Sequence, residues 1–334
     1  MIAEAGVNHL GSIDNGRKLI EAAKRAGADI VKFQTYKAEK LTTRNAARFW
    51  NWDGEIKSDG TQFDSYSLLD DFGFDEHLEL KRICDEVGIE FLSTPFDNES
   101  VDMLVEIGVK GFKIASCDIT NHGLLKHVAA TGLPILLSTG ASDLNEIEQS
   151  VAFLKLAGCV DLLLMHCTLS YPTKTEDSNL LAIHTIQRKF PDIPVGLSDH
   201  TLGPLIGASS ALLGACAIEK HFTFDKTLPL SADHWLSADE EEFKLMVSWV
   251  REFELARGSG QKVVLDSEKL ARQNARRSLV LKNNMKLGEV IQFDSLLAKR
   301  PGTGIPPNEI QNVIGRILNA DVKADELLQW HLLK

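Results

Sequence analysis

The stretch PVGLSDHTLG, residues 194–203, begins with a short apolar run. Ser-Asp-His follows this run and places an imidazole at His200. The next apolar run, ACAIEKHFT at 215–223, reaches a histidine in the same way, at His221. A continuous apolar run that stops at polar side chains is typical of a buried parallel strand whose carboxyl end faces a site. The two histidines are therefore expected at the ends of neighbouring strands.

Eight such runs, rich in Ile, Val and Leu, occur along the chain. They are 2–7, 29–34, 89–96, 110–116, 134–140, 161–167, 194–200 and 214–223. Most are separated by segments with helical spacing, and strands that alternate with helices imply parallel pairing. Eight units over about 250 residues predict a (β/α)8 TIM barrel. A doubly wound open sheet is the alternative, but no GxGxxG follows the first run.

The helical spacing is clear in NEIEQSVAFLKLAG, residues 145–158. Its apolar residues are Ile147, Val151, Phe153, Leu154 and Leu156, which we expect to form one buried stripe. The longest interruption of the pattern is 36–74, an aromatic and polar segment after the second strand. In a barrel it would lie on the active-site face as a lid or substrate loop, with a plain surface excursion as the alternative.

The alternation of apolar runs and helical segments ends near residue 258. We predict a barrel over 1–258, a linker over 259–276 and a small β-rich domain over 277–334. A domain of this last size buries too little apolar surface to be strongly stable alone, so it is expected to pack on a barrel.

Composition excludes several classes of protein. Of the 334 residues, 44% are hydrophobic and 25% charged, and the net charge of −11 argues against nucleic acid or an anionic membrane as the main partner. No apolar run is long enough for a transmembrane helix, and the start MIAEAGVNHLG does not resemble a signal peptide. The five cysteines form no CxxC pair, so we expect reduced thiols in a cytoplasmic protein.

The strand ends carry cations and hydroxyls that suit an anionic ligand. Lys32 and Lys113 lie inside apolar sequence, where an ammonium group is costly to bury unless an anion pairs with it. The hydroxyl groups that suit a phosphate beside them are Ser93, Thr94, Ser116 and Ser138. The alternative is a salt bridge from a lysine to Glu4 or Glu219.

His200 and His221 suggest a metal site, because adjacent strands place their ends about 5 Å apart. Two imidazoles leave most of the coordination sphere to water and substrate oxygens, which favours a labile divalent ion such as Mn²⁺, with Mg²⁺ or Co²⁺ as alternatives. A polar cluster without metal is the other interpretation. For His166, in LLLMHC, a buried and hydrogen-bonded imidazole is favoured over a functional role.

Eight motifs in register resemble one family, the sialic acid synthases. They are AEAGVNHLG, VKFQTYKAE, FLSTPFD, FKIASCD, LSTG, HCTLSYPT, GLSDHTLG and EKHFT. The later AKRPGTGIPP is similar to the antifreeze-like (SAF) domain that these enzymes carry. The resemblance spans nearly the whole chain. It implies a TIM barrel joined to an SAF domain, in a domain-swapped homodimer.

The resemblance also implies roles for individual residues. Glu4 and Glu219 would be the catalytic carboxylates, and His200 and His221 would hold Mn²⁺. The residues implied to hold phosphoenolpyruvate are Lys32, Thr94, Lys113, Ser116 and Ser138. Those implied to line the sugar site, together with Glu219, are Gln34, Asp118, Tyr171 and Asp233, while Arg300 would reach the site of the partner subunit.

The implied reaction condenses phosphoenolpyruvate with N-acetylmannosamine or a related 2-acetamido sugar and releases phosphate. Leu169 stands where the family often has asparagine, and LPLSADHW replaces a more usual segment, so a diacetamido-trideoxyhexose is an alternative acceptor, as in legionaminic or pseudaminic acid synthesis. A 6-phosphorylated acceptor would need basic side chains such as Lys37, Lys40, Arg44 and Arg48. A 3-deoxy-heptulosonate synthase and an inactive glycan-binding protein are the remaining alternatives.

Overall fold

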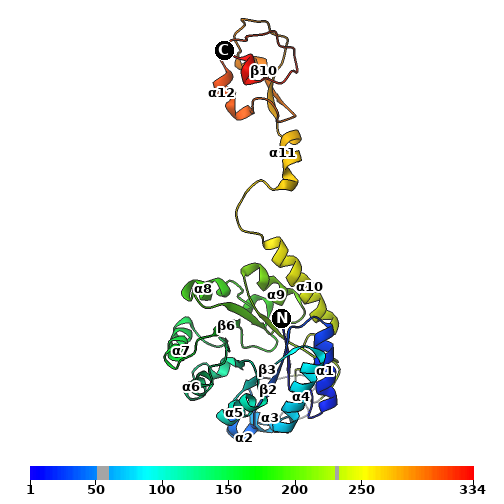
Figure 1. Ribbon diagram of the computed structural model, residues 1–334, viewed down its shortest axis with the longest axis vertical. Helices are drawn as coiled ribbons and strands as arrows, with labels where there is room; N and C mark the ends of the chain where they lie inside the picture. Colours follow the sequence, from blue (N-terminus) through cyan, green and yellow to red (C-terminus); the bar gives the residue numbers. More distant parts are fainter. Residues whose placement is uncertain (51–59, 230–232) are drawn as a thin grey trace. The chain divides into compact units, whose positions relative to one another are not determined.

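The computed structural model describes residues 1–50, 60–229 and 233–334. The chain divides into two compact units, Met1–Gly258 and Ser259–Lys334. In the first unit, eight strands form the centre and helices surround them (Figure 1). The strands are β1 (Ile2–Gly6), β2 (Ile30–Thr35), β3 (Glu90–Pro95), β4 (Phe112–Ile114), β5 (Ile135–Ser138), β6 (Leu162–Cys167), β7 (Val195–Asp199) and β8 (Ile218–His221).

Ten α-helices belong to the described part of this unit. They are α1 (Ile13–Arg25), α2 (Ala38–Leu41), α3 (Gln62–Tyr66), α4 (Phe74–Val87), α5 (Asn98–Ile107), α6 (His122–Ala130), α7 (Leu144–Leu156), α8 (Ala182–Lys189), α9 (Leu205–Ser209) and α10 (Glu240–Arg257).

The strands pair in parallel in the order β3-β2-β1-β8-β7-β6-β5-β4. The two end strands, β3 and β4, also contact each other, so the sheet is a nearly closed barrel. The predicted (β/α)8 fold is confirmed. Every strand lies within its predicted run or extends one residue past it, because long apolar runs are a strong local signal.

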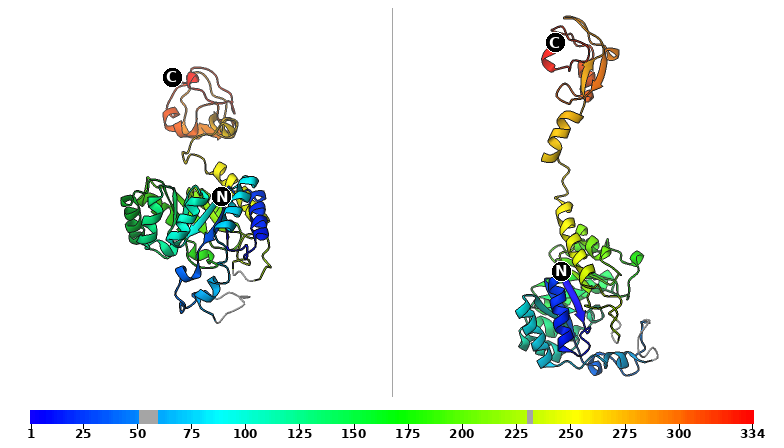
Figure 2. Two further views of the ribbon diagram at one scale, coloured as in Figure 1. Left: turned by 60° about the horizontal axis from the view of Figure 1, so that its bottom comes forward. Right: turned by 90° about the vertical axis from the view of Figure 1, so that its right-hand side faces the viewer.

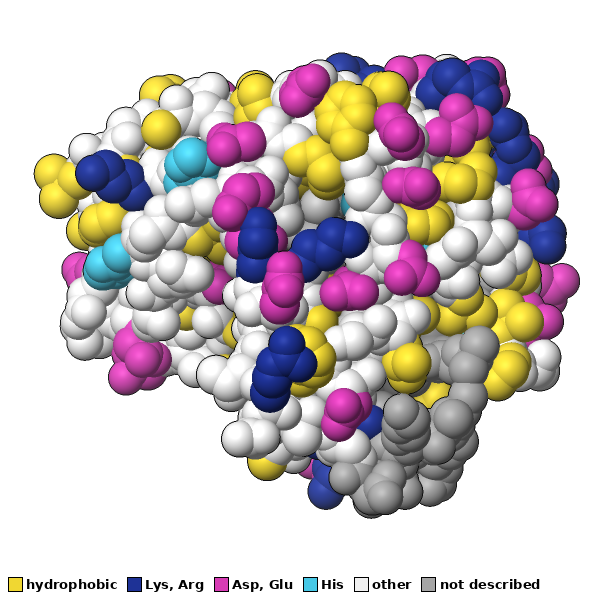
Figure 3. Space-filling view, turned by 90° about the horizontal axis from the view of Figure 1, so that it is seen from below, with side chains coloured by type: hydrophobic (Ala, Val, Ile, Leu, Met, Phe, Trp, Pro, Cys, Tyr) yellow, Lys and Arg dark blue, Asp and Glu magenta, His cyan; other side chains and the backbone are white. Residues whose placement is uncertain are grey.

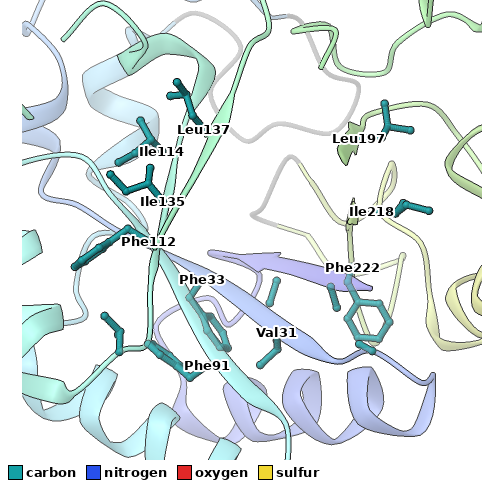
Figure 4. Close-up of a cluster of buried hydrophobic side chains, with 14 of the residues drawn as sticks. Val31, Phe33, Phe91, Phe112, Ile114, Ile135, Leu137, Leu197, Ile218 and Phe222 are labelled. Atoms are coloured by element: carbon teal, nitrogen blue, oxygen red, sulfur yellow. The ribbon is translucent and has the colours of Figure 1, made fainter. Parts of the chain in front are cut away.

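Alternation along each strand separates the core from the barrel interior. In β2, Val31 and Phe33 join the core between strands and helices, where Phe91 of β3 lies beside them (Figure 4). Lys32 and Gln34, between and after them, line a cavity inside the barrel. Successive side chains of a strand point to opposite faces, so each apolar anchor on the outside is followed by a functional group on the inside.

Helix α7 tests the predicted apolar stripe. Asp143 caps its first turn by accepting hydrogen bonds from two backbone N–H groups. Ile147, Val151 and Leu154 are buried as predicted, but Leu156 is 89% exposed, so its placement in the stripe was wrong. At about 100° per residue, nine residues turn a helix by two and a half turns, which places Leu156 opposite Ile147.

The long segment after β2 forms α2 and α3 beyond one end of the barrel (Figure 2). Thr61 caps α3 and forms a reciprocal capping box with Asp64. Part of the predicted substrate loop, residues 51–59, lies outside the described residues, as do residues 230–232 of the LPLSADHW segment.

The second unit contains helices α11 (Lys269–Ala275) and α12 (Ile310–Val313) and an antiparallel pair, β9 (Ser278–Leu281) with β10 (Leu296–Lys299). Its own core includes Leu279, Ile291, Val313 and Leu328. Helix α11 lies within the predicted linker, but it packs on this unit, since the backbone N–H of Gly302 donates to the carbonyl of Gln273 at 2.7 Å.

The surface agrees with the charge composition. On the face seen in Figure 3, Asp and Glu side chains are interspersed with Lys and Arg and do not leave one broad basic patch. Across the described ranges, none of the helices combines the length and apolar character needed to cross a membrane.

Candidate active site

A cavity of about 400 Å³ lies at the carboxyl ends of the barrel strands. Thirteen of the fourteen predicted site residues line it, namely Glu4, Lys32, Gln34, Thr94, Lys113, Ser116, Asp118, Ser138, Tyr171, His200, Glu219, His221 and Asp233. The fourteenth, Arg300, belongs to the second unit and directly follows β10. Residues that are far apart in sequence meet here because parallel strands end at one rim.

Four charged side chains form a buried, alternating chain inside this cavity. The ammonium nitrogen of Lys32 lies 2.5 Å from Oε2 of Glu4 and 3.9 Å from Oε2 of Glu219. The ammonium nitrogen of Lys113 lies 3.0 Å from Oε1 of Glu219. The salt bridges considered as the alternative for these lysines are therefore present. They leave two ammonium groups and two carboxylates facing a space large enough for a small ligand.

Two of these side chains, Glu219 and Lys32, are held in their charged forms. Burial raises the pKa of Glu219, but the ammonium groups of Lys113 and Lys32 outweigh burial and lower it to about 2. Burial lowers the pKa of Lys32, and the carboxylates of Glu219 and Glu4 outweigh it, so that this pKa is raised. Ser198, which sequence reasoning placed at a strand end without a role, donates a hydrogen bond to Oε1 of Glu219 at 2.9 Å.

The predicted hydroxyls fall on both faces of the strands. Thr94 accepts a hydrogen bond from Lys32 at 3.1 Å, and Ser138, which lines the cavity, is buried without a hydrogen-bond partner among the residues that the structure describes. Ser93 was expected beside the phosphate, but this was wrong, since its hydroxyl donates to the carbonyl of Phe33 and lies 2.7 Å from that of Thr35. Adjacent residues of a strand point to opposite faces, so Ser93 and Thr94 cannot both face the cavity.

His200 and His221 lie side by side, with ring centroids 5.3 Å apart. Ser198 pairs with Glu219 in the ladder, and Asp199 with Lys220, so the two histidines follow at equivalent positions. Nδ1 of His200 is 2.9 Å from the carbonyl oxygen of Thr168. A carbonyl can only accept, so Nδ1 carries a proton, and Nε2 is the nitrogen that could bind a metal.

Asp233 lies beside the Nδ1 atom of the second histidine, His221. Its Oδ2 is 3.2 Å from Nδ1 of His221, which leaves Nε2 of that ring as the nitrogen available to a metal. Burial raises the pKa of Asp233, but the imidazoles of His221 and His200 outweigh it and lower this pKa. Sequence reasoning placed Asp233 at the sugar. The structure adds a contact that only the fold could reveal.

The two imidazoles suit a labile divalent ion. Among residues 1–50, 60–229 and 233–334, no group of three or more His, Cys, Asp or Glu side chains is placed to hold a metal. An ion at His200 and His221 would therefore take its other ligands from water or substrate. His200 has the outer hydrogen-bond partner that metal-bound imidazoles usually have, and His221 has a carboxylate oxygen close to its Nδ1 atom.

One wall of the cavity is aromatic. The sequence indicated only that the segment 36–74 is rich in aromatic residues. Tyr36 meets Tyr66 and Phe96 edge to face, with centroids 5.6 and 5.9 Å apart. Of the four basic residues considered for a phosphorylated acceptor, Arg48 lines the cavity. The other three have partners elsewhere: Lys37 donates to the carbonyls of Asp70 and Phe72, Lys40 pairs with Glu99, and Arg44 lies over Phe63.

Comparison with known proteins identifies both parts of the chain. The NeuB family matches residues 19–262, and the SAF domain matches residues 276–334. The chain is 41% identical to the N,N'-diacetyllegionaminic acid synthase of Legionella pneumophila, over 99% of this chain and 93% of that protein. It is 32% identical to the human N-acetylneuraminate-9-phosphate synthase, over 100% of this chain and 92% of that protein.

A solved structure agrees with these matches. The N-acetylneuraminic acid synthetase of Leptospira borgpetersenii, in complex with citrate, is 37% identical, with a TM-score of 0.71 over 81% of this chain and 88% of that chain. Fold, cavity and sequence similarity together show that this chain belongs to the NeuB family.

Proposed function

We propose that the chain is a nonulosonic acid synthase, which condenses phosphoenolpyruvate with an open-chain 2-acetamido sugar and releases inorganic phosphate. The observation that carries the proposal is the meeting of two buried lysines and two buried histidines at one cavity of about 400 Å³. Cations suit the anionic donor, and imidazoles suit a metal that can bind an aldehyde oxygen.

Phosphoenolpyruvate would take the side of the cavity near β2 to β5. Lys32 and Lys113 supply positive charge, and the hydroxyls of Thr94, Ser116 and Ser138 line the same space. The unpartnered hydroxyl of Ser138 supports this placement, because a buried polar group without a partner is costly unless a ligand satisfies it. Binding would exchange part of the contact between lysines and glutamates for contacts to phosphate and carboxylate.

His200 and His221 would hold a divalent ion, with Mn²⁺ as the first candidate. When bound, such an ion supplies Lewis acidity to the sugar aldehyde. The remaining ligands would be water and sugar oxygens. Thr168 and Asp233 lie at the Nδ1 atoms of these rings, so the Nε2 atoms would be the ones to hold the ion.

The chain's own residues would then transfer protons and stabilise the charges that develop during the reaction. C3 of phosphoenolpyruvate attacks the aldehyde carbon, whose oxygen becomes a hydroxyl by taking up a proton. Water adds to the cationic C2, and cleavage of its C–O bond releases phosphate and leaves a keto acid. Glu4 is the general acid and base for these steps, since its Oε1 is held by Gln34 at 2.8 Å and its Oε2 by Lys32. The lysines stabilise the departing phosphate.

The acceptor is proposed to be N-acetylmannosamine, the simplest 2-acetamido sugar of this kind. A second candidate is 2,4-diacetamido-2,4,6-trideoxymannose. Leu169 lines the cavity, and an apolar side chain suits a methyl group better than a hydroxymethyl group. The higher identity to a diacetyllegionaminic acid synthase than to the human 9-phosphate synthase points the same way.

Phosphate release tests the proposal directly. The purified full chain would be assayed with phosphoenolpyruvate and Mn²⁺, adding N-acetylmannosamine, its 6-phosphate or the diacetamido sugar in parallel. We expect release with one unphosphorylated sugar, loss of activity in EDTA and recovery with added Mn²⁺. No release with any of the three would contradict the proposed reaction, and activity that persists in EDTA would contradict the metal.

We also propose a homodimer in which Arg300 serves the cavity of a second copy. The segment 259–334 has 12 basic and 8 acidic residues in a chain whose net charge is −11, so a basic unit would meet an acidic barrel. Mixing two inactive variants, Arg300→Ala and Glu4→Gln, would restore activity if the arginine acts on the partner. Failure to complement after subunit exchange, together with a monomeric mass in solution, would contradict this arrangement.

A further inference from the structure

A second buried ion pair lies on the same two strands as the histidines, but on their outer face. The ammonium nitrogen of Lys220 is 2.7 Å from Oδ2 of Asp199, and the two side chains are 1% and 2% exposed. Strand alternation explains the placement, because His200 and His221, the next residue in each case, line the cavity. The pair therefore lies behind the candidate metal site without contributing to its walls.

The hydrogen bonds of this pair enclose the main chain around His200. The ammonium group of Lys220 also donates to the carbonyl of Thr201 at 2.6 Å. The backbone N–H of Thr201 donates to Oδ1 of Asp199 at 2.9 Å. Asp199 and Thr201, which flank His200, are thus both bound to Lys220, the residue before His221. Any slip between the two strand ends would have to break these bonds.

The surroundings of the pair are closely packed. A Cβ added to Gly207 of α9 would lie 3.0 Å from Oδ2 of Asp199 and 2.7 Å from the sulfur of Met246. Helix α9 therefore packs closely over the pair. A buried ion pair is weak evidence for stability, since apolar residues of similar volume often serve the fold as well. The pair can therefore have a role other than stability.

We propose that Asp199 and Lys220 are positioning residues that set the spacing and orientation of His200 and His221 for a divalent ion. The inference rests on the proposed function, in which these two histidines bind the metal. With only two protein ligands, the affinity of the site depends strongly on how well both rings are held. Loss of outer-shell support typically costs a metal site about 10- to 100-fold in affinity.

Metal affinity without substrate separates positioning from folding. The Kd for Mn²⁺ would be measured on the full chain by electron paramagnetic resonance of the free ion, beside thermal unfolding. The variants are Asp199→Asn, which preserves shape, and Asp199→Leu with Lys220→Met, which replaces the pair by apolar residues. The matched control, Asp321→Leu with Lys286→Met, removes an exposed pair in the second unit whose nitrogen and oxygen are 2.8 Å apart.

We expect both variants of the buried pair to fold and to raise the Kd about 10-fold or more, with the control unchanged. A folded Asp199→Asn or double variant with a Kd within twofold of the wild type would overturn the inference alone. A wild-type chain that binds no Mn²⁺ would overturn both the metal site and the inference, whereas phosphate release would test the reaction class separately.

Discussion

The barrel strands carry buried charges on both faces, and the two faces use them differently. The inner set is Glu4, Lys32, Lys113 and Glu219, and it lines the cavity. The outer pair, Asp199 and Lys220, is as deeply buried but lies under α9 with all its bonds made within the protein. A charge beside a cavity can exchange its partner for a ligand. A charged group buried under a helix has no access to a ligand and can only keep segments of the chain in position.

Burial therefore does not separate catalytic from structural groups, whereas the face of the strand does. The same contrast holds for hydroxyls, since Thr94 and Ser138 line the cavity while Ser93 is bonded within the outer layer. Substitutions on the inner face should lower activity at nearly constant stability. Substitutions of apolar residues on the outer face should do the reverse, whereas changes to the pair of Asp199 and Lys220 should weaken metal binding in a folded protein.

The largest effect is expected for Glu4→Gln on the inner face. Glutamine keeps the size of the side chain but cannot exchange protons, so phosphate release should fall about 10²- to 10⁴-fold. The thermal midpoint should change little. Steady-state phosphate assays and thermal unfolding check both, with Glu99→Gln on the exposed side of α5 as the control. A loss of less than tenfold would remove Glu4 from the proton transfers.

Phe91→Ala tests the outer face. The ring is 2% exposed and stacks on Phe33 at 5.7 Å, so its removal should lower the free energy of unfolding by about 3–5 kcal/mol. Activity per folded molecule should stay within a few-fold. Urea unfolding followed by assay measures both, and Leu156→Ala, at an exposed position, should change neither. A large loss of activity without loss of stability would break the comparison.

His9 gives the outer layer a pH dependence. Burial, and then repulsion from His77, lowers the pKa of His9 to about 3, so the folded state keeps it neutral while the unfolded state takes up a proton below about pH 6.5. Stability is thus full above pH 6.5 and declines as the pH falls toward 3, by about 1.4 kcal/mol per pH unit from this group. Urea titrations at several pH values measure the slope. An unchanged slope in His9→Gln would contradict the assignment.

The smallest effect is expected for an exposed ion pair. Arg25 of α1 forms three hydrogen bonds to Glu240 of α10, with side chains 58% and 37% exposed. Because water and salt screen such a pair, Arg25→Ala should cost about 0.2–1 kcal/mol, and less in 1 M salt. Urea unfolding at two salt concentrations tests this. A loss that salt does not reduce would mean that the arginine stem, and not its charge, stabilises the contact.

Local pattern was sufficient for much of this protein. The eight apolar runs predicted the strands, since a buried parallel strand must be continuously apolar, and the family motifs pointed to the barrel and SAF domain that the fold and comparisons confirm. Thirteen candidate site residues could be chosen from strand ends and motifs because strand ends converge in any such barrel. Their roles stay predictions.

Contacts between distant segments were decided only by the tertiary structure. The pairing of Lys32 with Glu4, of Asp233 with His221 and of Lys220 with Asp199 depends on strand register and on where loops return. Sequence patterns report the period of one segment at a time, which is why Leu156 and Ser93 were misplaced. A sequence can state that a charge is buried, but its partner is set by which other segments the fold brings within a few ångströms.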